Sequence, residues 1–132
     1  MSRWILCFSL LALAGCGGEP VIDHSRDPEM FAIDVKELVA TSVADARTSD
    51  EPADALWGIV DYLAELGRHP TGQHRNVYQQ IHALASEIYA DAQDVDGRPP
   101  DLDERLDELW ALAEQLPGDV EPPPITADAP DD

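Results

Sequence analysis

Cys16 is the residue whose surroundings point most clearly to chemistry. It follows a segment in which one basic residue, Arg3, precedes the apolar run 4–13 and the two small residues Ala14 and Gly15. This order of charged, apolar and small residues is typical of a secretory signal peptide. The apolar run is shorter than the roughly 20 residues that a membrane-spanning helix needs. Residues 1–15 are therefore predicted to be a cleaved signal peptide.

The four residues at the predicted cleavage point, Leu13-Ala14-Gly15-Cys16, resemble the lipobox of bacterial lipoproteins. The resemblance covers residues 1–16 only. It implies that the Cys16 thiol receives a diacylglyceryl group, that the chain is cut before this cysteine, and that the new amine is acylated in many bacteria. Two or more acyl chains hold a protein stably on a membrane, whereas one holds it only marginally. We expect this covalent lipid and no cofactor.

The residues after Cys16 bear on the location of the protein. Gly17 and Gly18 stand where some enteric lipoproteins carry the aspartate that retains them at the inner membrane. The sequence therefore predicts export and a lipid anchor in a bacterial membrane, and it favours the outer membrane facing the periplasm. Residues 16–27 show no sustained period and are predicted to form a flexible tether that reaches at most about 35 Å.

Composition excludes several classes of function. The chain has 27 acidic and 8 basic residues and a formal net charge of −19 at pH 7. Nucleic acid repels such a surface, so no nucleic-acid partner is expected. Of the two cysteines, Cys7 would be removed with the signal peptide and Cys16 would carry lipid. No thiol would then remain for a disulfide, a metal site or a nucleophile, and the fold would rest on packing.

Residues 28–116 carry four amphipathic helical patterns, in which apolar residues recur every three or four positions. Asp27 with Pro28 is a typical helix start, and Asp101 with Glu104 resembles a capping box before the fourth pattern. The helices are expected to end near Arg47, at Gly67, at Gly97 and before Pro117. The apolar stripes are Phe31, Val35, Leu38, Val39 and Val43; Leu56, Ile59, Val60, Leu63 and Leu66; Val77, Ile81, Leu84 and Ile88; and Leu102, Leu106, Leu109, Ala113 and Leu116.

Four such helices with short loops predict an all-α fold, a small four-helix up-down-up-down bundle over residues 28–116. The alternative is a coiled-coil dimer or trimer built on the third and fourth helices, so the oligomeric state stays open. Residues 117–132 contain five prolines, five acidic residues and no base. This composition predicts a disordered acidic, proline-rich tail.

Histidines and carboxylates are the candidates for a metal site. His74, Tyr78 and His82 lie at successive four-residue steps, and Asp94 and Asp96 partly resemble the calcium loop of an EF-hand. The His pair at four-residue spacing that is typical of helical zinc sites is missing, and several calcium-ligand positions hold Ala or Pro. Surface histidines at a helix start and a helix stop explain these residues without a metal, so no metal site is predicted.

No nucleophile with an acid–base partner, phosphate-binding loop or metal motif is visible in the sequence, so catalysis is not expected. The sequence predicts a non-catalytic, membrane-anchored envelope lipoprotein that acts as a protein-interaction or structural module, with another envelope protein as partner. The alternative is a bundle of the same fold that binds a small ligand or a metal ion. The two hypotheses differ in whether the helices enclose a lined cavity or pack around a filled core.

The lipid anchor is directly testable. Cells that express the protein and are fed a radioactive fatty acid should label it, because the predicted lipidation attaches acyl chains to Cys16. A Cys16→Ser variant should carry no label, since the thiol is lost. An unlabelled wild type or a labelled Cys16→Ser variant would contradict the prediction.

Overall fold

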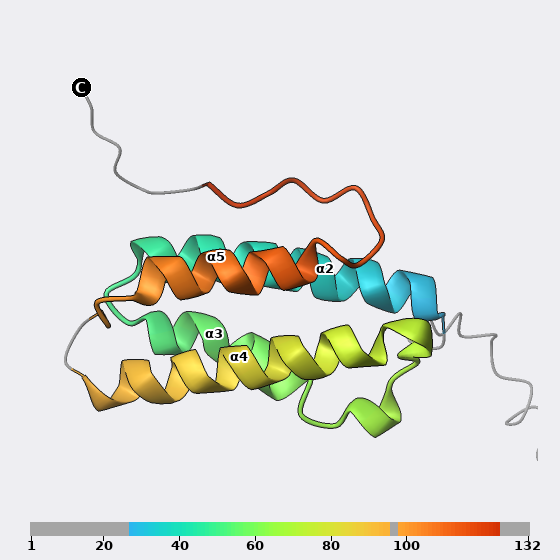
Figure 1. Cartoon of the computed structure of the whole chain (residues 1–132), viewed down its shortest axis with the longest axis horizontal. Coiled ribbons are helices and arrows are strands. Elements are labelled where there is room, and N and C mark those ends of the chain that lie inside the picture. The colour runs from blue at the N-terminus through green and yellow to red at the C-terminus, as the bar shows by residue number, and fades with distance from the viewer. Residues whose placement is uncertain (1–26, 96–97, 125–132) are drawn as a thin grey trace, which may run out of the picture.

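The computed structural model describes residues 27–95 and 98–124, and these residues form four α-helices without any strand. The helices are α2 (Pro28–Thr48), α3 (Pro52–Tyr62), α4 (Arg75–Asp94) and α5 (Leu102–Ala113), and the short 3-10 helices η2 (Leu66–Arg68) and η3 (Gly72–His74) lie between α3 and α4 (Figure 1). The predicted all-α class is confirmed. The predicted signal peptide, Cys16, nearly all of the predicted tether and Asp96 lie outside the described residues.

The start of α2 has the cap that the sequence predicts. The Asp27 carboxylate accepts a hydrogen bond from the backbone N–H of Glu29 at 3.0 Å, and Pro28 occupies the first turn. The capping box predicted at Asp101 is wrong, because this side chain makes no capping hydrogen bond. The reason lies in the backbone: Asp101 has φ −102° and ψ 16°, whereas Asp27 is extended, as a capping residue usually is.

Helix α3 ends at Tyr62, before the predicted end at Gly67. The chain folds back after Tyr62, and the Nε2 atom of His69 lies 3.1 Å from the Tyr62 carbonyl oxygen. The His69 ring also stacks on Phe31 and Tyr62, with centroid distances of 4.8 and 5.4 Å. These contacts occupy the end of α3 and replace the last predicted turn of the helix.

The helices meet in one apolar core. Helices α2 and α4 each pack against both α3 and α5, and Figure 1 shows the four lying side by side along the long axis of the molecule. The buried side chains form a single cluster that contains most of the predicted stripes of α2, α3 and α5 and half of the predicted stripe of α4. Its members are Phe31, Ala32, Val35, Val39, Val43, Ala46, Leu56, Ile59, Leu63, Tyr78, Ile81, Ala85, Ile88, Leu102, Leu106, Leu109, Ala113 and Leu116.

The buried face of α4 differs from the predicted one. Ile81 and Ile88 are buried as predicted, but Tyr78 and Ala85 fill the remaining inner positions. Val77 and Leu84, both predicted to be core residues, are only partly buried at the edge of the core. The Tyr78 ring packs edge-on against Phe31, with centroids 5.0 Å apart, which fixes the orientation of the helix.

Residues 117–124, which we call the strap, lie against α2, whereas the sequence predicts disorder from residue 117. The Nζ atom of Lys36 donates to the carbonyl oxygens of Leu116 and Gly118 at 3.1 and 2.9 Å. Arg47 donates to the Pro124 carbonyl oxygen and to the Asp107 carboxylate of α5. Figure 1 shows the strap doubling back over the helices after α5. Residues 125–132 lie outside the described residues.

Hydrogen bonds to its carbonyl groups explain why the strap packs against the fold and is not disordered as predicted. A proline-rich segment has few N–H groups to donate, but each residue still offers a carbonyl acceptor. Lys36 and Arg47 are both buried, at 9% and 8% exposure, so their charges need acceptors inside the fold. The strap supplies one carbonyl acceptor to each of them, and Pro123 within the strap is buried.

Gly118 permits the sharp turn into the strap, and its replacement should destabilise the fold. It has φ +115°, and an added Cβ would lie 2.8 Å from Cγ1 of Ile33. We expect Gly118→Ala to lower the free energy of unfolding by about 1–3 kcal/mol, because both backbone strain and overpacking act at this site.

The matched control is Gly67→Ala, because an added Cβ there meets nothing within 4 Å. This variant should change stability by no more than about 1 kcal/mol. Urea unfolding followed by circular dichroism measures both variants. Equal stability of the two would contradict the role given to Gly118.

Candidate functional site

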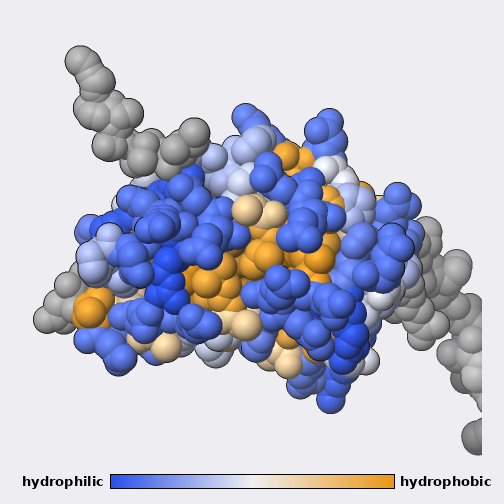
Figure 2. Space-filling view, viewed as in Figure 1, coloured by the Kyte–Doolittle hydropathy of each residue, from blue (hydrophilic) through white to orange (hydrophobic). Residues whose placement is uncertain are grey.

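A shallow apolar groove runs between α4 and α5 on the surface. Its floor consists of Ala83 and Leu84 from α4 and Ala111 and Leu112 from α5, and its volume is about 490 Å³. Figure 2 shows hydrophobic side chains gathered in the middle of the face that α4 and α5 present in that view, with hydrophilic side chains around them. Leu84 and Leu112 are only partly buried at the edge of the core, so both are available to line the groove.

The rim of the groove is polar and acidic. Gln80 and Glu87 line it from α4, and Glu108 and Gln115 line it from α5, so no basic residue is among its lining residues. Glu108 has no ion-pair partner within the described ranges, so its charge is free to act on a bound molecule.

Arg105 joins the two helices that form the groove. Its guanidinium lies 3.2 Å from the Glu87 carboxylate and also pairs with Asp91 of α4. The hydrogen bond to Asp91 raises the pKa of Arg105 above its ordinary value, although partial burial acts in the opposite direction. The positive charge nearest to the groove is therefore already neutralised by α4 carboxylates.

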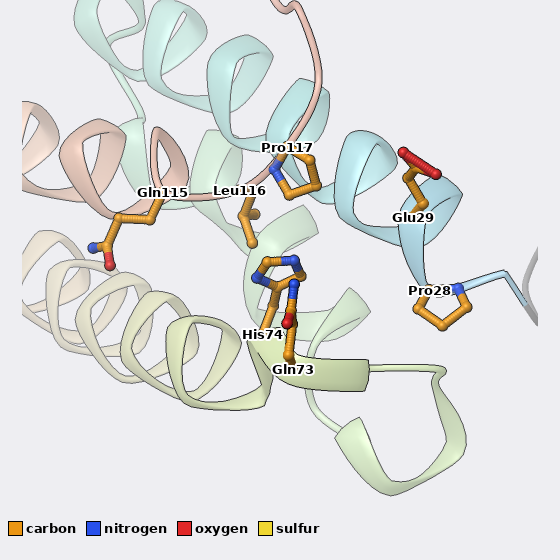
Figure 3. A pocket seen from close by; sticks show the side chains of 7 residues that line it. All are labelled: Pro28, Glu29, Gln73, His74, Gln115, Leu116 and Pro117. Atoms are coloured by element: carbon orange, nitrogen blue, oxygen red, sulfur yellow. The ribbon is translucent and has the colours of Figure 1, made fainter.

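A second pocket, of about 610 Å³, lies at the end of the domain where the chain enters α2. Its lining residues come from the start of α2, from η3 and from the segment after α5: Pro28, Glu29, Gln73, His74, Gln115, Leu116 and Pro117. In Figure 3 the His74 ring and the Gln73 side chain lie close together, whereas Glu29 and Gln115 lie apart from them on either side. The polar groups of this pocket therefore do not converge on one point.

The candidate metal ligands within the described ranges, His74, His82 and Asp94, do not form a metal-binding group. Tyr78 is fully buried, and His74 packs beside it with ring centroids 6.4 Å apart. Asp94 is exposed at the end of α4. Within the part of the chain that the structure describes, no group of three or more His, Cys, Asp or Glu side chains could hold a metal ion.

Two buried polar atoms on α4 lack hydrogen-bond partners among the described residues: the Tyr78 hydroxyl and Nε2 of His82. The positions of these residues four apart place them on the same side of α4. Burial, and secondarily the nearby Tyr62, raises the pKa of Tyr78 to about 12. The Tyr78 hydroxyl is therefore a neutral, buried group.

Trp57 is the most exposed of the large hydrophobic side chains in the described ranges. It is 49% exposed on α3 and packs against Tyr89 of α4 with ring centroids 5.3 Å apart. This pair lies outside the α4–α5 groove, because neither residue lines it. It therefore provides a comparison site on a different helix pair.

The chain matches no known family model, no curated protein and no solved structure. None of the helices in the described ranges is long and apolar enough to cross a membrane. Cys16, the predicted lipid attachment residue, lies outside those ranges.

Tyr78 should make stability depend on pH in alkaline solution. Its pKa is about 12 in the folded chain and about 10 when unfolded. Between these values the unfolded state loses the phenolic proton first, so the stability contribution is complete below pH 10 and is lost as pH rises toward 12. Tyr78→Phe should reduce this alkaline loss of stability, and it should be at least as stable as wild type at pH 7, because it removes an unpaired buried hydroxyl.

Urea unfolding measured from pH 9 to pH 12 would test this effect. Tyr89→Phe is the control, because it leaves Tyr78 in place and should keep the wild-type loss of stability. A Tyr78→Phe variant that loses stability as steeply as wild type would exclude Tyr78 as the cause.

Proposed function

We propose that the chain is a non-catalytic envelope lipoprotein that recognises another envelope protein. Lipid on Cys16 would anchor it, residues 16–27 would serve as its tether, and a four-helix up-down-up-down bundle would present the interaction surface. The Gly17 and Gly18 pair supports an outer-membrane location facing the periplasm. The partner would be reached within the roughly 35 Å that the tether can extend.

One observation carries the interaction proposal. Leu84 and Leu112 form the floor of an open groove, although the core beneath it is already filled by the buried residues of α4 and α5. Partly exposed apolar side chains that are gathered in one place, with a polar border, are typical of protein-interaction surfaces. The groove therefore supports a binding role better than a purely structural one.

The alternative, a ligand-binding or metal-binding bundle, has less support. Apolar side chains fill the interior of the described domain, and the two pockets described above are open to solvent at its surface. The pocket at the start of α2 contains His74, but its polar groups come from three segments and do not point to a common centre. A bound ligand is usually held by a few convergent polar groups within an apolar cavity.

Site-specific photocrosslinking in living cells tests the proposal. A photoreactive amino acid would replace Ala83 or Ala111, which are exposed residues of the groove, or Ala64, which is exposed in the turn after α3. We expect both groove positions to crosslink to the same envelope protein and Ala64 to give no such product. The products should be lost in the Cys16→Ser background, because that chain is not anchored beside its partner.

All three replaced residues are exposed alanines, so a difference in crosslinking would reflect where each residue lies in the fold. Equal products from Ala64 and the groove positions would contradict a specific surface. Absence of any reproducible product from Ala83 and Ala111 would contradict the interaction function itself.

A further inference from the structure

We propose that the α4–α5 groove binds a basic amphipathic helix of the partner protein, an inference that rests on the proposed function. The occupant is inferred from three properties of the groove: its shape, its apolar floor and the charge of its rim. Together they identify the kind of partner as well as the place where it binds.

The shape of the groove fits a helix. Two helices border it along stretches of equal length, from Gln80 to Glu87 on α4 and from Glu108 to Gln115 on α5. Each stretch spans about 11 Å, or two helical turns. An amphipathic helix that packs into such a groove presents apolar residues at spacings of three, four and seven. Its apolar face would cover Leu84 and Leu112.

The negative charge of the rim favours a positively charged partner. Glu87 and Glu108 stand on opposite sides of the groove, and Arg105, the nearby cation, is paired with Glu87 and Asp91. A partner helix with Lys or Arg beside its apolar face would place cations against both glutamates. Such complementary charges favour encounter and suppress wrong partners.

The same charges argue against other occupants. A second copy would bring a net charge of −19 and an identical acidic rim against this one. Residues 125–132 of the same chain contain three aspartates and no base, so the rim repels them as well. A surface of anionic lipid has the same unfavourable sign. A basic helix is the occupant that satisfies both the floor and the rim.

Designed peptides can test the proposal on the mature lipoprotein, held in nanodiscs of neutral phosphatidylcholine. The probe is a fluorescein-labelled helix of about 14 residues, with leucine on one face and lysine on the other. One comparison peptide has the same composition in a scrambled order, and another has glutamate in place of lysine. Fluorescence polarisation, with empty nanodiscs as the blank, measures binding.

We expect the amphipathic lysine peptide to bind with a Kd on the order of 10 µM. The scrambled and glutamate peptides should bind at least about tenfold more weakly, and added salt should weaken the lysine peptide because exposed charges are screened. Equal binding of the scrambled peptide, or tighter binding of the glutamate peptide, would overturn the proposal.

Two pairs of substitutions locate the binding site. Leu84→Asn with Leu112→Asn should weaken binding about tenfold or more, since it makes the floor polar. Glu87→Gln with Glu108→Gln should weaken binding and reduce its salt dependence, and it leaves the apolar packing intact. The controls are Trp57→Asn on α3 and Glu37→Gln on α2, both exposed outside the groove, and they should change the Kd by less than about twofold.

The outcomes separate this inference from the proposed function. If Ala83 and Ala111 crosslink to one envelope protein in cells but the lysine peptide shows no preference, the basic-helix occupant is wrong and the interaction function stands. Self-association of the lipoprotein that the leucine substitutions abolish would instead assign the groove to a second copy and overturn the proposal. If the leucine pair does not fold, as judged by circular dichroism, the glutamate pair alone decides, and unchanged binding by that pair overturns the proposal.

Discussion

The described fold depends on four apolar helix faces packing into one core. Each helix has two neighbours, so each must place one stripe inward and use the two flanks of that stripe for lateral contacts. The arrangement leaves no helix in the centre and requires bulky side chains to fill the middle. Tyr78 and Phe31 do so with an edge-on contact of 5.0 Å, and their position determines which residues of α4 remain at the edge.

Four of the six basic residues in the described ranges connect different elements of the fold. Lys36 and Arg47 join α2 to the strap, Arg98 donates to the Ala46 carbonyl oxygen at the end of α2 at 2.7 Å, and Arg105 joins α5 to α4. Surface ion pairs usually contribute little, but Lys36 and Arg47 are buried, so loss of their acceptors would leave uncompensated charge inside the fold. These connections tie α2 to the strap and α5 to α4 by polar contacts in addition to the packed core.

The sequence predicts where the helices lie along the chain better than it predicts which face of each helix is buried. Asp27 and Pro28 mark the start of α2 by local chemistry, which requires no knowledge of the rest of the chain. The choice between Val77 and Tyr78 as a core residue is different. Adjacent residues are only about 100° apart around a helix, and both Val77 with Leu84 and Tyr78 with Ala85 have helical spacing. Only the space beside Phe31 decides it. The groove could not be predicted for the same reason, since it depends on Leu84 being at the edge.

The strap also shows why composition alone can mispredict the structure of a segment. Proline and acidic residues predict disorder when a segment is considered alone, because it has little apolar surface to bury. In the folded chain, however, Lys36 and Arg47 lie 11 positions apart on α2, and both need hydrogen-bond acceptors. Eleven residues of helix rise about 16 Å, and the six steps from Gly118 to Pro124 span about 19 Å in an extended proline-rich conformation. The two lengths agree well enough for the strap to reach both cations.

This use of the basic residues also shapes the outer surface. The 27 acidic residues far outnumber the 8 basic ones, and Lys36, Arg47, Arg98 and Arg105 make contacts between elements, so the surface charge is mainly negative. An apolar groove on such a surface discriminates by sign: an acidic protein that offers a suitable apolar face is still repelled, whereas a basic one is attracted over about a Debye length. Because these basic residues make contacts within the fold, the acidic rim of the proposed binding groove would favour a cationic partner.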